Sequence, residues 1–125
     1  MQTILSTRDV PAPQAFEYWH DVASRRISPH EGKPADRTHF AAEIQIGSLV
    51  DLHLMIWNVS PSEFDVTSRH VTHFNDDNLF LVRLAAGRAV IELGEHEIVP
   101  QVGDMWLLDP RLPNRGRLHE HPLPA

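Results

Sequence analysis

Arg83 is the first residue whose type and position suggest chemistry, because it interrupts an apolar segment. Residues 79–86 read LFLVRLAA, and in an extended strand Arg83 shares a face with Leu81. An unpaired guanidinium is costly to bury, so an inward-facing Arg83 requires a carboxylate partner. A bound acidic small molecule would supply that partner. The alternative is an outward-facing Arg83 that pairs with Glu92 or Asp51.

Two tryptophans offer the apolar part of the same candidate site. Ligand cavities in β-barrels are largely apolar and carry a few polar anchors. Trp57 and Trp106 fall in predicted strands and could wall such a cavity, although both side chains also suit an ordinary core. We therefore predict a ligand site with Arg83 as its anion anchor and Trp57 and Trp106 as its walls. The matching ligand would be aromatic or carboxylated.

The nine histidines raise the question of a metal site. His70 and His73 are three residues apart in a predicted strand, where odd separations point to opposite faces. His119 and His121 would share a face if extended, but they lie in a proline-rich end. A structural metal site needs three or four convergent ligands. We expect surface histidines, no metal-binding residue and no cofactor.

The sequence offers no catalytic constellation. Ser60, Ser62 and Ser68 lie near histidines and aspartates, but no G-x-S-x-G elbow surrounds them. The paired carboxylates Asp76 and Asp77 sit in a polar cluster that is typical of a solvated turn. No phosphate-cradling loop or dinucleotide fingerprint is present. The prediction is a protein that is not an enzyme and has no catalytic residue.

Length and charge limit the classes of protein to which this chain can belong. At 125 residues, a single domain is expected. The net charge of −6 argues against direct nucleic-acid binding, which needs clustered Lys and Arg. Cysteine is absent, no signal peptide is visible, and no apolar run approaches the ~20 residues of a membrane span. We expect a cytoplasmic protein with no membrane partner.

Strands must position the candidate residues, because short apolar segments alternate with turn residues over about 38–110. The breaks at Gly87, Gly94 and Gly103 predict antiparallel pairing, and Gly103 is expected to supply a positive φ. Strands are predicted at residues 40–46, 49–59, 64–74, 79–85, 88–93, 97–99 and 105–108. This pattern predicts a mainly β domain, either a small barrel or a sandwich.

One amphipathic helix is predicted before the strands, over about residues 13–27. Four apolar side chains recur there at helical spacing: Phe16, Trp19, Ala23 and Ile27. Such a stripe has to pack on the sheet. The polar residues left for water are Glu17, Asp21, Ser24 and Arg25.

Two polar segments are expected to lack regular structure. Residues 28–38 hold Gly32 and Pro34 and are predicted to form a loop. A turn is also predicted at Gly47-Ser48. Residues 111–125 are predicted to be an irregular tail with at most a short strand near residue 117.

The sequence also resembles a known family. The opening STRDVP at residues 6–11, followed by F-x-x-W at 16–19, is similar to the start of a group of AraC-type transcriptional regulators. The segments L-x-x-G-x-A-V at 84–90 and V-G-D-x-x-L-L-D at 102–109 resemble the barrel of the same group. The similarity spans roughly residues 5–113.

This resemblance implies a cupin-like antiparallel β-barrel, or jelly roll, that senses a small effector and contributes to dimerisation. The expected partners are a small-molecule effector and a second copy of the chain. Family members normally carry C-terminal helix-turn-helix units, but no helical periodicity follows Pro110. The expectation is therefore an effector-binding domain involved in transcription regulation, truncated or stand-alone, without a DNA-binding domain.

Two alternatives stay open beside this interpretation. One is a metal-dependent cupin enzyme, although metal-binding cupins place a histidine where this chain has Asp104-Met105 after Gly103. The other is an interaction module that forms mixed dimers with a full-length regulator. An incomplete barrel would also leave an open strand edge, which invites pairing with a second chain. We therefore predict that the chain self-associates or is poorly soluble.

Overall fold

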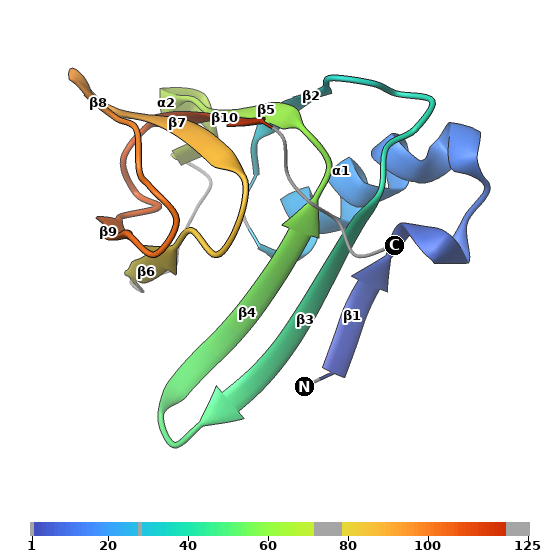
Figure 1. Ribbon diagram of the computed structural model, residues 1–125, viewed down its shortest axis with the longest axis horizontal. Coiled ribbons are helices and arrows are strands. Elements are labelled where there is room, and N and C mark those ends of the chain that lie inside the picture. The colour runs from blue at the N-terminus through green and yellow to red at the C-terminus, as the bar shows by residue number, and fades with distance from the viewer. Residues whose placement is uncertain (1, 28, 72–78, 120–125) are drawn as a thin grey trace.

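The computed structural model describes residues 2–27, 29–71 and 79–119 (Figure 1). The helical elements are η1 (Thr7–Asp9), η2 (Ala12–Gln14), α1 (Ala15–Arg26) and α2 (Ser68–Val71). The strands are β1 (Gln2–Ser6), β2 (Glu31–Pro34), β3 (Ala42–Leu49), β4 (Leu52–Val59), β5 (Ser62–Val66), β6 (Phe80–Arg83), β7 (Arg88–Leu93), β8 (His96–Ile98), β9 (Met105–Leu108) and β10 (Asn114–His119).

These strands form three sheets, and every pairing is antiparallel. The strand orders are β1-β3-β4, β2-β5-β10-β7-β8 and β6-β9. The predicted mainly β, cupin-like architecture with one N-terminal amphipathic helix is confirmed. The sheets do not close into a continuous barrel, because β4 is not hydrogen-bonded to the β6–β9 pair.

Helix α1 packs on the three-stranded sheet and forms the larger core. Phe16, Trp19 and Ala23 are buried, as their helical spacing predicts. Phe40 meets Phe16 edge to face, with ring centroids 5.1 Å apart. The other buried members of this core are Leu5, Ala15, Ala42, Ile44 and Val59. Ser24 was expected to face water, but its hydroxyl oxygen is buried without a hydrogen-bond partner among the described residues.

A second, smaller core lies on the inner face of the five-stranded sheet. Leu84, Ala89 and Ile91 are buried there, and Trp106 of β9 packs against them. Leu118 of β10 contacts both cores, so the two are continuous. The β6–β9 pair therefore covers part of the five-stranded sheet, while α1 covers the three-stranded sheet.

The glycine turns between the later strands are confirmed. Gly87, Gly94 and Gly103 have φ of 79°, 63° and 97° respectively. Residues with a side chain rarely adopt this left-handed backbone conformation, whereas glycine does so at little cost. These turns allow β6 to β9 to follow one another in short antiparallel pairs.

The turn between β3 and β4 lies further along the chain than predicted. Gly47 and Ser48 belong to β3 and pair with Leu54 and His53 of β4. The turn is formed by Val50-Asp51 instead. The strand register explains why the turn lies later than predicted. Pairing between β3 and β4 continues as far as Leu49 and Leu52, so Gly47 lies within a strand.

Two segments predicted to be irregular are strands. Strand β2 lies in the predicted loop 28–38, and β10 lies in the predicted tail 111–125 between β5 and β7. The strand β10 lacks a hydrophobic pattern because outward residues such as Arg115 are charged and the inward Gly116 has no side chain. A Cβ at Gly116 would lie 2.2 Å from Cε1 of the Phe64 ring, so this position needs glycine.

The strand predicted over residues 64–74 ends at Val66 and is followed by the helical turn α2. The hydroxyl oxygen of Thr67 accepts the backbone N–H of His70 at 3.5 Å. Such local side-chain bonds compete with sheet pairing. His70 therefore lies in a helical turn rather than a strand, while His73 and the turn predicted after it lie outside the described residues.

Candidate functional site

The hairpin of β3 and β4 has an inward face and an outward face, because side chains alternate along each strand. From the body of the molecule to the hairpin tip, the inward cross-strand pairs are Ala42–Val59, Ile44–Trp57, Ile46–Met55 and Ser48–His53. The outward face carries Leu52, Leu54 and Ile56 of β4, which are all exposed.

Helix α1 covers the part of the inward face nearest the body of the molecule. Ile44 and Val59 are buried beneath it. Trp57 meets Trp19 of α1 edge to face, with ring centroids 5.5 Å apart, yet Trp57 is still 38% exposed. Trp57 therefore marks the boundary between the covered and the open parts of this face.

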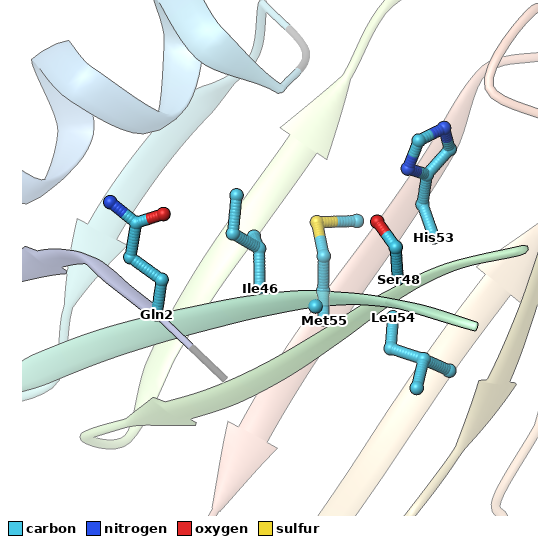
Figure 2. A pocket seen from close by; sticks show the side chains of 7 residues that line it. Gln2, Ile46, Ser48, His53, Leu54 and Met55 are labelled. Atoms are coloured by element: carbon cyan, nitrogen blue, oxygen red, sulfur yellow. The ribbon is translucent and has the colours of Figure 1, made fainter.

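A hollow of about 520 Å³ occupies the open part (Figure 2). Its lining residues are Gln2, Ile46, Gly47, Ser48, His53, Leu54 and Met55. Figure 2 shows the Gln2, Ile46, Ser48, His53 and Met55 side chains on one side of the hairpin, whereas Leu54 points to the other side. The volume lies in the range of small-molecule sites.

The lining combines an apolar surface with polar groups. Ile46 and Met55 supply aliphatic and thioether surface, and the Trp57 ring is the next inward side chain of β4 beyond Met55. Gln2 offers an amide, which can donate and accept hydrogen bonds, and Ser48 and His53 can do the same with a hydroxyl and an imidazole. The hollow suits a small molecule with an apolar body and one polar or anionic group.

The structure brings one of the three predicted site residues to this hollow. Trp57 lies beside it on the inward face, whereas Trp106 packs into the second core against Leu84 and Ala89. The proposed walls therefore lie on different sheets. Their roles in binding a ligand stay a prediction.

Arg83 is exposed and lies on the opposite face of the β6–β9 pair from Trp106. Its cross-strand neighbour is Met105, whereas Trp106 pairs with Val82. Within the part of the chain that the structure describes, Arg83 makes no ion pair, so the alternative pairing with a carboxylate is not formed. The structure does not bring Arg83 to either tryptophan, and its role as an anion anchor stays a prediction.

Comparison with known proteins identifies the family. A model of the AraC-binding-like domain matches residues 19–122, which is most of the chain. The chain belongs to the AraC-binding-like domain family. Its expected resemblance to AraC-type effector-binding domains is thereby confirmed.

Two longer proteins are similar to this AraC-binding-like domain. An uncharacterized protein in the nit 5′ region of Bacillus sp. (strain OxB-1) is 26% identical over 121 residues, covering 90% of this chain and 44% of that protein. The crystal structure of the AraC-like transcriptional activator CuxR matches with a TM-score of 0.78 and 18% identity, covering 92% of this chain and 43% of that one. The second likeness shows the fold. The chain spans less than half the length of each relative.

A second hollow of the AraC-binding-like domain, of about 370 Å³, lies over the outer face of the five-stranded sheet. Its charged lining residues are Glu31, Lys33, Glu63, Asp65, Glu92, Arg115 and Arg117. The Arg115 guanidinium lies 3.1 Å from Asp65 and 4.0 Å from Glu92. Because Arg115 is already engaged by carboxylates and the lining holds four carboxylates against three cations, this surface is better explained by cross-strand ion pairs than by anion binding.

Two carboxylates with lowered pKa values lie in loops away from both hollows. Hydrogen bonds from the Thr38 side chain, His39 and the Thr38 backbone lower the pKa of Asp36 from 3.8 to about 2. Hydrogen bonds from the Arg111 side chain and backbone lower the pKa of Asp109. Both carboxylates stabilise exposed loops and take no part in the candidate site.

Two of the described histidines are neighbours, since the His20 and His30 rings meet edge to face with centroids 4.9 Å apart. His70 shares a hydrogen bond with the Thr67 hydroxyl, His119 ends β10, and His121 lies outside the described residues. Across residues 2–27, 29–71 and 79–119, no three metal-ligating side chains gather at one point. Over the same ranges, none of the helices has the length and apolar character needed to cross a membrane.

Sequence reasoning missed the polar residues of the hollow. Gln2 lies in a strand that was not predicted, and Ser48 was assigned to a turn. His53 and Met55 alternate with Leu52 and Leu54 in the sequence, and this alternation was an available signal. It could not identify a site, however, because the pairing with β3 was unknown.

Proposed function

We propose that this chain is the effector-binding domain of an AraC-type transcription regulator, working in the cytoplasm without catalysing a reaction. In this proposal a small molecule binds in the hollow lined by Gln2, Ile46 and Met55, next to Trp57, and the domain also takes part in self-association. The observation that carries the proposal is the open inward face of the β3–β4 hairpin beyond Trp57, with its hollow of about 520 Å³. Membership of the family supports the regulatory role.

The ligand class follows from the lining. The apolar body of the ligand would contact Ile46 and Met55, and its inner end would meet the exposed edge of Trp57. A carboxylate or carbonyl group would accept hydrogen bonds from the Gln2 amide, the Ser48 hydroxyl or an N–H of the His53 ring. We therefore propose a small aromatic or aliphatic carboxylic acid as the effector class.

Regulation would come from a population shift, since a ligand changes an equilibrium by binding one arrangement better than another. Gln2 belongs to the edge strand β1, whereas the rest of the lining belongs to the hairpin. A ligand that bridges Gln2 and Met55 would hold β1 against β3. Effector binding would thus order the N-terminal strand.

Thermal-shift titration with benzoate, indole-3-acetate and octanoate tests this proposal. At least one of these acids is expected to raise the melting temperature of the chain in a saturable way. Met55→Trp should abolish the rise by filling the hollow, whereas Leu107→Trp, on the exposed outer face of β9, should retain it. No stabilisation by any of the three acids, or equal stabilisation of the wild type and Met55→Trp, would contradict the proposed site.

A further inference from the structure

Strand β4 forms one edge of the three-stranded sheet, and among the described residues it is hydrogen-bonded to β3 alone (Figure 1). It runs over eight residues, Leu52–Val59, without a Lys, Arg, Asp or Glu. An edge strand of this kind presents a row of backbone N–H and C=O groups that can pair with another chain. The side chains of Leu52, Leu54 and Ile56 beside that row are exposed.

The other edge strands of the described structure carry features that hinder pairing. Strand β1 has five residues and an irregular register between Thr3 and Leu5. Strand β2 has four residues, including Lys33 and Pro34, and β8 has three. Strands β6 and β9 have four residues each. Short length, bulges, charge and proline are the usual protections of sheet edges, and β4 has none of them.

We propose that β4 pairs antiparallel with β4 of a second copy of the chain, so that two three-stranded sheets join into one. This pairing supplies the interface for the self-association in the proposed function and rests on it. Two copies that each carry a net charge of −6 repel one another, so they can associate only through a contact free of like charges. The β4 edge meets that requirement.

The strand is also complementary to itself. In the joined sheet the outward faces of both copies lie on the same side. The two-fold axis is then perpendicular to the sheet and passes between the two copies of one β4 residue, so that directly opposite residues lie on the same face. An axis at Met55 overlaps Leu52 to Asn58. It places Leu54 opposite Ile56 of the second copy, and by symmetry Ile56 opposite Leu54 of the second copy. These four side chains form an apolar cluster on the outward face.

This register also extends the candidate effector site. With the axis at Met55, His53 lies opposite Trp57 of the second copy on the inward face. The second copy then adds an aromatic side chain at the edge of the hollow lined by His53 and Met55. Self-association and ligand binding are thereby coupled, so each strengthens the other.

Single-cysteine crosslinking tests the interface, because the natural sequence contains no cysteine. Directly opposite residues of an antiparallel pair are about 4.5–5.5 Å apart at Cα, within the range of a disulfide. Met55→Cys should therefore form a disulfide-linked dimer on mild oxidation. His53→Cys is the matched control, since its counterpart is displaced by about 13 Å along the strand. It should crosslink about tenfold more slowly although His53 is the more exposed residue.

Light scattering on the chain without cysteine gives the second measurement. We expect a mass twice the 14.2 kDa of one chain. Leu54→Lys should shift this mass to that of a monomer with unchanged circular dichroism, because a lysine on an edge strand opposes pairing. Leu107→Lys, the same change on the outer face of β9, should leave the dimer intact.

A monomer at high protein concentration, or equal crosslinking of Met55→Cys and His53→Cys, would overturn the proposal and leave the edge to a different protein. These readouts are separate from the thermal shift by carboxylic acids. Failure of the interface and failure of the effector site are therefore distinguishable.

Discussion

Trp19 and Trp57 meet edge to face, with ring centroids 5.5 Å apart and ring planes at 82°. This contact joins the middle of α1 to the inward face of β4. It also ends the covered part of the hairpin, because Trp57 meets α1 and the next inward side chain of β4 is Met55, which lines the hollow. The position of α1 and the shape of the candidate site therefore depend on the same pair of rings.

Truncation of Trp57 tests this dependence. Trp57→Ala should lower the free energy of unfolding by about 2 kcal/mol, since an edge-to-face pair and a partly buried ring are lost. Trp57→Phe keeps an aromatic ring against Trp19 and should cost less than half as much. Urea denaturation measures both values. Equal stability of Trp57→Ala and the wild type would show that the pair contributes nothing.

Gly116 tests the packing of β10 in the five-stranded sheet. Gly116→Ala should lower the free energy of unfolding by about 1–3 kcal/mol, because the new Cβ would overlap the Phe64 ring. The clash should be relieved in a Phe64→Ala background, where adding Gly116→Ala should cost far less. A double-mutant cycle by urea denaturation measures the coupling, and additive costs would contradict the contact.

Val50 tests the hairpin turn. It has φ of 56° and is 92% exposed, so its β-branched side chain is strained without contributing to the core. Val50→Gly should raise the free energy of unfolding by up to about 1 kcal/mol. Val99→Gly, at an exposed valine without positive φ, should not stabilise the chain. A loss of stability in Val50→Gly would contradict the turn geometry.

Asp36 gives a prediction about pH. Its folded pKa of about 2 lies below the unfolded value of 3.8, so the carboxylate contributes stability above pH 3.8. That contribution is lost as the pH falls towards 2. Asp36→Asn should therefore be less stable than the wild type at pH 7, and the difference should shrink below pH 3.8 and vanish only below pH 2.

Denaturation curves across this pH range measure the Asp36 difference. Asp51→Asn, the matched loss of one carboxylate in the exposed hairpin turn, serves as the control for net charge. A stability difference for Asp36→Asn that persists unchanged to pH 2 would show that the hydrogen bonds from Thr38 and His39 do not favour the ionised form.

The elements that could be predicted from the sequence are those in which the spacing of apolar residues matches the side that is buried. Strands β7 and β9 lie at the predicted residues, 88–93 and 105–108, because each is apolar on its inner face and bounded by a glycine turn. Helix α1 was found from the spacing of Phe16, Trp19 and Ala23. In each case local sequence and long-range packing agree.

The remaining elements depend on partners that are distant in the sequence. Strand β10 is held between β5 and β7, its charges lie on the outer face, and Gly116 accommodates Phe64 from another strand. Strand β1 has five residues in which polar and apolar side chains do not alternate regularly. It is extended because it pairs with β3. No local signal reports these contacts.

The candidate site divides in the same way. Trp57, predicted as an apolar wall, lies next to the hollow on the inward face of β4, and its role in binding stays a prediction. Arg83 was singled out because it interrupts an apolar segment, but Leu81, which shares its face of the strand, is exposed as well. The grouping of Gln2, Ser48 and His53 arises from the registers of three strands, which sequence alone does not contain.

Methyl NMR of the methionines tests the central claim most directly. The chain has three methionines, and Met55 lines the hollow whereas Met105 lies exposed on the outer face of β9. With an acid that stabilises the chain, the Met55 methyl signal is expected to move in a saturable way while the Met105 signal stays. A stabilising acid that moves the Met105 signal and leaves that of Met55 in place would contradict an effector site in the β3–β4 hairpin.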